Sequence, residues 1–217
     1  MSHEMLNLFI KATGQTLLMA GLSCAISIIL AIPLGIILLI TQSGHLLPRP
    51  QLNRALSLIV NAWRSAPFIV LLVAIIPFTR LIVGTSIGTL AAVVPLTLAT
   101  IPFLARLFEN AFENVSQGLI EAAQAMGASN LQIVYKILLP ESLPMLVRNV
   151  TLTLVTLVGY SAMAGVVGAG GLGDVAIQYG YERFETNVMI ITVILLIIMV
   201  QVMQMIGDRL ASWLKRG

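Results

Sequence analysis

The stretch Ile26–Leu39 reads ISIILAIPLGIILL and lies within an uncharged run that extends from residue 12 to residue 48. A helix needs roughly 20 consecutive apolar residues to span a bilayer, and this run is longer. A strand of a membrane β-barrel alternates between apolar and polar residues, whereas Ile26–Leu39 does not alternate. The stretch therefore predicts a transmembrane helix over about residues 16–40.

The rest of the chain repeats this pattern. Its 217 residues are 58% hydrophobic and only 10% charged, with a mean hydropathy of +0.98, whereas soluble domains average about 25% charged residues. Three further runs lack charge, residues 81–105, 149–173 and 186–207, and residues 55–79 are interrupted only by Arg64. We predict an all-α membrane protein, a single transmembrane domain over residues 1–217. Its five transmembrane helices are expected at about 16–40, 55–78, 86–107, 144–166 and 187–207.

Three classes of protein are excluded by composition. Such an apolar chain is not a soluble enzyme, and the single cysteine, Cys24, excludes a disulfide scaffold. A net charge of +3 is too small and too scattered for a nucleic-acid interface, so the partner predicted from composition is the lipid bilayer.

The cations of the connecting segments predict the orientation. Segments on the cytoplasmic side of a membrane carry an excess of lysine and arginine. One predicted side carries only Lys11, Arg80 and Arg183. We therefore expect the N terminus outside and the C terminus in the cytoplasm. The side predicted to be cytoplasmic carries eight cations: Arg49, Arg54, Arg106, Lys136, Arg148, Arg209, Lys215 and Arg216.

The predicted spans contain no aspartate, glutamate or histidine. Ion-coupled transporters carry ionisable groups within the membrane, and a membrane enzyme needs a base or metal ligands there. His3 and His45 lie in polar flanks without partners at ligand spacing. We therefore predict no catalytic, cofactor-binding or metal-binding residue in this chain.

Nucleotide-binding motifs are also missing. No G-x-x-x-x-G-K-[ST] loop occurs, and the G-x-G-x-x-G match at Gly168–Gly173 follows a membrane span instead of a strand. We interpret Gly168–Gly173 as an outer turn that permits positive φ and close helix approach. Energy for uphill transport would then come from another subunit.

The longest loop, residues 108–143 between spans three and four, predicts two short helices. Ser116 is expected to cap the first, and Gly127 to end it in a left-handed conformation. Ser129 and Gln132 form a capping box for the second helix, and Pro140 is expected to stop it. One face of the first helix is predicted to carry Leu119, Ile120, Ala123 and Met126.

The same loop carries the pattern E-A-A, three residues, G, nine residues, I-x-L-P. In this pattern the chain resembles the permease subunits of ABC importers. In that family the loop forms a coupling helix in a cleft of a cytoplasmic ATPase subunit, which binds ATP and Mg. The resemblance implies these ATPase-coupling residues: Glu121, Ala122, Ala123, Met126, Gly127, Ile137, Leu139 and Pro140.

The resemblance covers nearly the whole chain and is closest to the D/L-methionine branch of the family. It is carried by Arg64–Phe68, Pro77–Arg80, Val83–Gly88, Val94–Thr97, Gly159–Met163 and Gly168–Gly173. It implies a type I ABC importer permease fold in the bacterial inner membrane and a pathway for an amino acid, most specifically methionine. Two alternatives stay open: a permease for another amino acid or small polar solute, and a non-transporting membrane anchor or assembly protein.

The resemblance also implies three partners. These are a second copy of the chain, two copies of the ATPase and an extracytoplasmic substrate-binding protein. The binding protein is expected at the outer segments, about residues 79–86 and 167–186. The second of these segments carries Asp174, Tyr179, Tyr181, Glu182, Arg183 and Glu185.

A polar stripe follows the fourth predicted span. Asn149, Thr153, Thr156, Tyr160 and Met163 recur in steps of four and three, which places them on one helical face. Such a stripe faces protein or water instead of lipid. We predict that it lines the translocation pathway, with Met163 at the outer gate, although the same groups can instead hold helices together. Neighbouring Ser161 completes the predicted set.

Arg64 is the charge that lies furthest from the ends of a predicted span, and Pro67 lies close to it. We assign Arg64 to the pathway, as an attraction for a substrate carboxylate or as a contact between permease copies. The alternative is an arginine that snorkels to the inner interface. Arg106 and Glu109, at the inner end of span three, are expected to form an ordinary pair on the helix surface.

Overall fold

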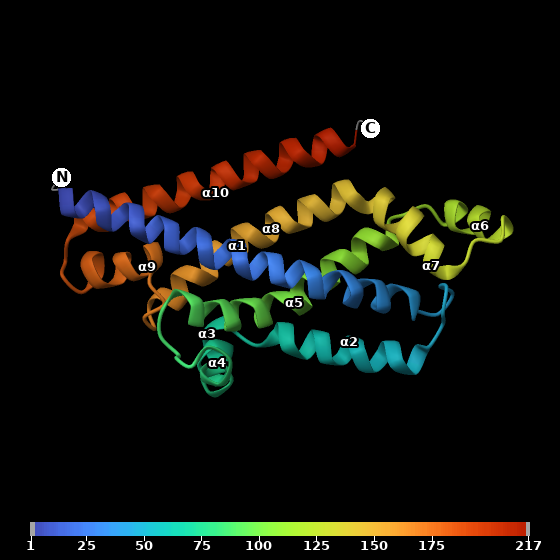
Figure 1. Ribbon diagram of the computed structural model, residues 1–217, viewed down its shortest axis with the longest axis horizontal. Coiled ribbons are helices and arrows are strands. Elements are labelled where there is room, and N and C mark those ends of the chain that lie inside the picture. Colours follow the sequence, from blue (N-terminus) through green and yellow to red (C-terminus); the bar gives the residue numbers. More distant parts are fainter. Residues whose placement is uncertain (1–2, 216–217) are drawn as a thin grey trace.

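The computed structural model describes residues 3–215, and all of their regular secondary structure is helical. Long helices lie side by side and give the molecule an elongated shape (Figure 1). The four longest are α1 (His3–Ile40), α5 (Thr89–Glu113), α8 (Leu139–Gly165) and α10 (Thr186–Leu214). Shorter elements connect them: α2 (Pro50–Ser65), α3 (Phe68–Ala74), α4 (Ile76–Val83), α6 (Gln117–Ala125), α7 (Asn130–Ile133), η1 (Val134–Leu138), α9 (Gly171–Val175) and η2 (Ala176–Tyr181).

Four of these segments are long and apolar enough to cross a membrane, and the bent pair α2–α3 makes a fifth. The all-helical architecture predicted from the sequence is therefore confirmed. The first span is longer than predicted, because α1 begins at His3 and already buries Phe9 and Ala12 before residue 16. Lys11, which suggested a later start, is exposed on the surface of this helix.

α1 and α5 pack closely along much of their length. Ser23 and Ser27 of α1 donate hydrogen bonds to the carbonyls of Val93 and Thr97 in α5, at 3.4 and 3.3 Å. These bonds lie on either side of Pro95, which α5 accommodates without a break. A side chain at Gly35 would meet the Ala105 carbonyl oxygen at 2.9 Å, so this glycine permits the close approach.

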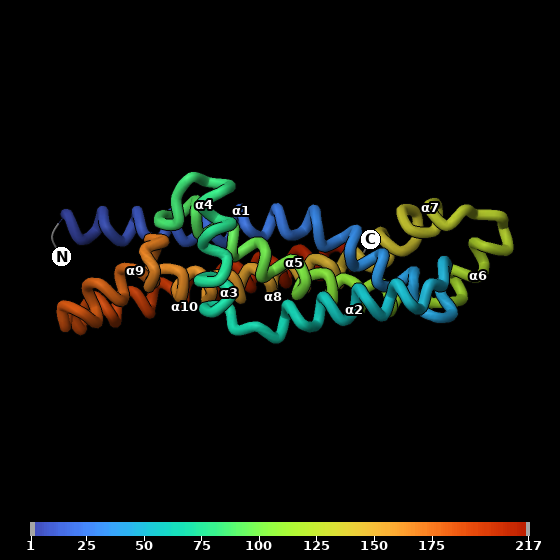
Figure 2. Tube along the Cα trace, turned by 90° about the horizontal axis from the view of Figure 1, so that it is seen from below, coloured from blue at the N-terminus to red at the C-terminus, as the bar shows by residue number. Residues whose placement is uncertain are grey.

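The prediction of one continuous helix over residues 55–78 is wrong. α2 ends at Ser65, α3 begins at Phe68, and the two are bent by 100°. Pro67 has no N–H to continue the helix, and Ala66 before it adopts the extended backbone that a following proline favours. Residues 61–67 are all exposed, so no packed neighbour holds the helix straight. α4 then projects to one side of the bundle (Figure 2).

The prediction that Pro140 stops the second loop helix is also wrong. α7, η1 and α8 form one unbroken helix of 36 residues, Asn130–Gly165. η1 is a π-helical turn, in which the Leu139 N–H bonds to the Val134 carbonyl, five residues back. This wider turn precedes Pro140 directly, so the helix continues where a proline would otherwise clash with the preceding turn.

The molecule has two distinct ends (Figure 1). The coupling loop, residues 108–143 with α6 and α7, lies at one end, where α1 also finishes. The glycine-rich end, residues 165–185 with α9 and η2, lies at the other, beside the start of α1. Each end has its own buried cluster, with Met19, Leu157 and Leu172 toward the glycine-rich end and Phe108 and Leu138 toward the coupling loop.

Candidate functional site

The first turn of the coupling loop involves two members of its sequence motif, Ala123 and Gly127. Gly127 has a φ of +79°, as predicted for the residue after the end of α6. Its N–H bonds to the Gln124 carbonyl at 2.9 Å, and the Ala128 N–H bonds to the Ala123 carbonyl at 3.0 Å. This pair of bonds is a Schellman motif. The spacing from Ala123 to Gly127 is therefore the spacing that this helix ending requires.

The caps of the two loop helices differ. Ser129 begins α7 with the predicted capping box, in which its hydroxyl accepts from the Gln132 N–H and the Gln132 side chain accepts from the Ser129 N–H. Ser116 occupies the N-cap position of α6, but its side chain makes no capping bond. The predicted Ser116 cap is wrong, because its hydroxyl is not directed at the free N–H groups of the first turn.

The motif residues divide into an exposed and a packed set. Ala123 is buried, and Ile137 and Leu139 pack against the same cluster near Phe108. Met126 is 82% exposed, and Leu119 is exposed as well. The predicted single face of Leu119, Ile120, Ala123 and Met126 is therefore wrong, because α6 ends at Ala125, before Met126.

Two of the remaining members of the motif, Glu121 and Pro140, lie beside hollows in the protein surface. Glu121 is exposed and lines a pocket of about 560 Å³ between α6 and the end of α1. Pro140 lines a second pocket, of about 700 Å³, and Ala122 is exposed. The loop thus presents an apolar tip, a carboxylate and small residues to a partner, while its base packs into the bundle.

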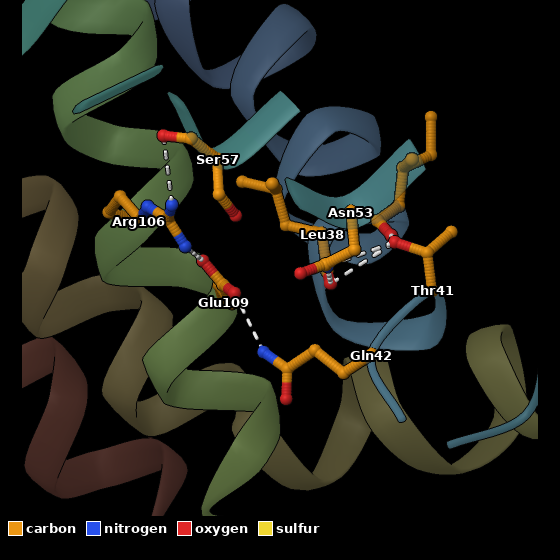
Figure 3. A network of polar contacts seen from close by, with 8 residues as sticks. Leu38, Thr41, Gln42, Asn53, Ser57, Arg106 and Glu109 are labelled. Atoms are coloured by element: carbon orange, nitrogen blue, oxygen red, sulfur yellow. Dashed lines mark hydrogen bonds and ion pairs between the residues drawn. The ribbon is translucent and has the colours of Figure 1, made fainter. Parts of the chain in front are cut away.

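A buried polar network supports the base of the loop (Figure 3). Arg106 and Glu109 of α5 form an ion pair at 2.6 Å, and Glu109 also accepts from Gln42 at 2.8 Å. Arg106 further donates to the Ser57 carbonyl of α2 at 3.4 Å. Glu109 is only 3% exposed, so the expectation of an ordinary surface pair is wrong: neighbours from α1 and α2 cover it.

A second part of this network closes the corner between α1 and α2 (Figure 3). Asn53 donates to the Leu38 carbonyl at 2.6 Å and to the Thr41 hydroxyl at 3.1 Å. The Leu38 carbonyl belongs to the last turn of α1, which has no helical partners of its own. The sequence did not predict the roles of Thr41, Gln42 and Asn53. The available signal was Glu109, a carboxylate only two residues beyond a predicted span.

The polar stripe of the fourth span divides along its length. Asn149 is buried and donates to the Leu107 carbonyl of α5 at 2.8 Å. Thr153, Thr156 and Ser161 donate to carbonyls of their own helix, at 2.9 Å or less. Toward the coupling loop, one member of the stripe therefore joins two helices, while the hydroxyls bond within α8.

Two predicted pathway residues from distant parts of the sequence meet at one pocket. Tyr160 stacks on Phe68, with ring centroids 4.5 Å apart. The Arg64 guanidinium carbon lies 5.8 Å from the centre of the Phe103 ring. All four side chains line a pocket of about 280 Å³ at the break between α2 and α3. Met163, the predicted gate, is 47% exposed and does not line it.

The glycine-rich end forms the turn that was predicted. Gly168, Gly170 and Gly171 all have positive φ. The Gly171 N–H bonds to the Gln15 side chain at 3.0 Å and the Leu172 N–H to the Thr16 hydroxyl at 2.9 Å. Side chains of α1 thus satisfy the N–H groups at the start of α9.

The residues beyond this turn carry the charges of the glycine-rich end. The pKa of the Asp174 carboxyl is raised above its usual value, chiefly by burial. A hydrogen bond from Gln178 opposes this shift, and the nearby Glu182 carboxylate adds to it. Arg183 lies over the ring of Tyr179, 4.2 Å from its centre. Among residues 3–215, no group of three histidine, cysteine, aspartate or glutamate side chains is placed to hold a metal ion.

With the fold and the loop established, the class of the protein follows from a family comparison. Residues 31–217 match a family described as "Binding-protein-dependent transport system inner membrane component". The chain belongs to this family, and it is the permease subunit of an ABC transporter, a transport component and not an enzyme.

Individual relatives place the chain near one branch of the family. It is 58% identical to a "Probable D-methionine transport system permease protein MetI" of Vibrio cholerae, over 94% of this chain and 91% of the relative. It is 52% identical to the "D-methionine transport system permease protein MetI" of Escherichia coli K12, over 76% of each chain.

Solved structures agree with this placement. One chain described under "Inward facing conformations of the MetNI methionine ABC transporter" is 50% identical, covers 99% of both chains and has a TM-score of 0.97. A chain of an amino acid ABC transporter with histidines is 20% identical at a TM-score of 0.71, over 97% of this chain and 94% of that one. That second likeness concerns the fold alone.

Proposed function

We propose that the chain is the membrane-spanning subunit of an ATP-driven importer of methionine, in both its D and L forms. The single observation that supports this substrate most strongly is the 58% identity, over almost the full length, to a permease named for D-methionine transport. The likeness to a methionine ABC transporter chain, at a TM-score of 0.97, supports the same proposal.

Two copies of the chain form the pathway in this proposal, each contributing its five spans. The two coupling loops bind two copies of a cytoplasmic ATPase, which holds ATP and Mg. The exposed Met126, the carboxylate of Glu121 and the Gly127 turn are the contact features of each loop. A substrate-binding protein delivers methionine to the glycine-rich end, where Tyr181 and Phe184 are exposed.

The coupling loop faces the cytoplasm in this proposal, and the chain starts outside. Seven of the eight cations counted for the cytoplasmic side belong to the described residues, and Arg216 lies outside them. The buried Cys24 allows a direct test. In a Cys24→Ala background, a Met126→Cys variant should react with a membrane-impermeant thiol reagent in inverted vesicles. Reaction in right-side-out cells and not in inverted vesicles would reverse the orientation.

Substrate identity is tested by uptake. Vesicles that contain the permease and its ATPase, supplied with ATP and the binding protein, should accumulate labelled methionine. Unlabelled D- and L-methionine should compete, and amino acids of other side-chain classes should compete poorly. Uptake of a different amino acid in preference to methionine would replace the substrate. No uptake of any amino acid would favour a membrane anchor or assembly protein.

Docking of the ATPase is tested at the tip of the loop. Met126→Glu places a charge on an 82% exposed side chain, so the fold should stay intact while ATPase binding and uptake fall at least tenfold. Leu47→Glu is the matched control, because Leu47 is an exposed apolar residue at the same end, between α1 and α2. Equal behaviour of the two variants would contradict the assigned loop.

A further inference from the structure

Arg64 lies in the last turn of α2, one turn before the 100° break. The hydrogen bonds and ion pairs of the described residues give Arg64 no carboxylate partner, and the ring of Phe103 is its one recorded side-chain contact. An arginine at membrane depth that lacks a partner is expensive, and such residues commonly mark a functional site. Non-helical backbone at this depth is tolerated where it lines a cavity, as the break at Pro67 does.

The pocket beside Arg64 combines this charge with aromatic and small apolar side chains. Phe68 and Tyr160 stack in parallel, and Phe103 lies next to the guanidinium. The volume is about 280 Å³, and the lining is completed by Trp63, Ala66, Leu71 and Ala99. No acidic side chain is among the described residues of this lining. The pocket therefore suits a small molecule with one anionic end and an uncharged remainder.

We propose that this pocket is a binding station for the substrate amino acid, with the Arg64 guanidinium pairing with its α-carboxylate. The planar guanidinium matches a carboxylate through two parallel hydrogen bonds. The substrate side chain packs against Phe68 and Phe103. The α-ammonium group lies toward the carbonyl end of α2, whose last turn carries partial negative charge. The proposal rests on the proposed function, because it assigns the substrate to a site within the importer.

The lining also determines which amino acids the station accepts. An uncharged side chain of methionine size meets no charged side chain of the lining besides Arg64, whereas a lysine or arginine side chain would bring a second cation close to Arg64. The pocket would then distinguish amino acids by their α-carboxylate and would reject those with a positively charged side chain. A single charge pair without further buried partners also binds weakly enough for release, which conduction requires.

The station is tested in membrane vesicles that contain the permease–ATPase complex without the binding protein. The probe is a photoreactive diazirine analogue of methionine, and labelled peptides are mapped by mass spectrometry. Label should appear on the segments that contain Phe68, Leu71, Phe103 or Tyr160. Excess methionine should abolish this label, whereas methionine amide, which lacks the carboxylate, should not. Label confined to other segments, or equal protection by both competitors, would overturn the proposal.

Variants test whether Arg64 causes the difference between methionine and methionine amide as competitors. Arg64→Gln should lower the label at least tenfold and remove the difference between methionine and its amide, while Arg64→Lys should retain part of both. Arg54→Gln is the matched control, because it removes an exposed cation from the same helix outside the pocket. An arginine that only snorkels or supports the helix end would leave the competitor difference intact in Arg64→Gln, and this result would overturn the proposal.

The two proposals fail in different ways. If the wild-type importer takes up no methionine, the proposed function is wrong, whatever the variants do. If it takes up methionine, and Arg64→Gln retains wild-type label and KM, then the binding station is wrong and the proposed function stands.

Discussion

The coupling loop and the glycine-rich end both turn the chain at glycines, but the glycines serve different purposes. At Gly127 a side chain would meet nothing within 4 Å, and glycine is required only because φ is +79°. Gly173 does not have positive φ, but a Cβ atom there would overlap the backbone of Ala162. Glycine is needed at position 127 for its backbone angle, whereas at position 173, within α9, it is needed for space.

The conformation at Gly127 is determined by neighbouring residues in the chain, whereas the contact at Gly173 is determined by the packing of two helices. The bonds that define the Gly127 turn all lie within six consecutive residues, Ala123–Ala128, so the turn can keep its shape while a partner binds it. At Gly173 the backbone of α9 approaches Ala162 of α8 so closely that no side chain fits between them. This contact exists only while the two helices keep their relative position. Substitutions at the two ends should therefore affect different properties.

The largest effect is expected for Gly173→Ala. The new methyl group must displace the backbone of Ala162, and overpacking of this kind costs about 3 kcal/mol. The midpoint of thermal unfolding in detergent should fall on the order of 10 °C. Gly14→Ala is the control, because a side chain there meets nothing within 4 Å. Equal midpoints for the two variants would show that α9 moves freely against α8.

A smaller and different effect is expected for Gly127→Ala. A left-handed backbone costs alanine about 1–2 kcal/mol, so ATPase binding should weaken up to about tenfold. The midpoint of thermal unfolding should fall by only a few degrees, less than in Gly173→Ala. Gly118→Ala lies in the same loop without positive φ and should bind normally. A fall in the midpoint as large as that of Gly173→Ala, with normal ATPase binding, would instead assign this glycine to packing.

The smallest effect compares the two serines that begin the loop helices. Ser129→Ala removes a capping bond worth about 1 kcal/mol, so amides near residues 130–134 should exchange with solvent about fivefold faster. Ser116→Ala should change nothing in hydrogen exchange, because the Ser116 side chain makes no capping bond. Equal changes at both helices would mean that the hydroxyl of Ser129 does not cap α7.

The same division explains what could be predicted from the sequence. The Gly127 turn and the Ser129 cap depend on neighbours in the chain, and both were predicted correctly. The break at Pro67 was not, because Pro95 and Pro102 lie within an unbroken α5. Pro95 is buried with bonds from α1 nearby, whereas residues 61–67 are exposed. A sequence shows a proline but not the helices that surround it.

The candidate site follows the same rule. The coupling motif is contiguous in one loop and could be recognised without the fold. The meeting of Arg64 with Tyr160 could not, because almost a hundred residues separate them and the bend before Phe68 brings them to one pocket. The burial of Glu109 was missed for a similar reason, since Gln42 donates to it from the segment after α1 and its ion-pair partner Arg106 donates to Ser57 of α2.

The unbroken helix from Asn130 to Gly165 has a mechanical consequence. It joins the second half of the coupling loop to Tyr160 without a break in the helix, although α7 and α8 run at an angle to each other (Figure 1). The part of α8 from Leu139 to Tyr160 corresponds to about 32 Å. A tilt of about 5° at its loop end would displace the far end by roughly 3 Å. The π-helical turn and Pro140 keep the chain helical at this angle, so a small rotation at the loop becomes an ångström-scale displacement at the level of Tyr160.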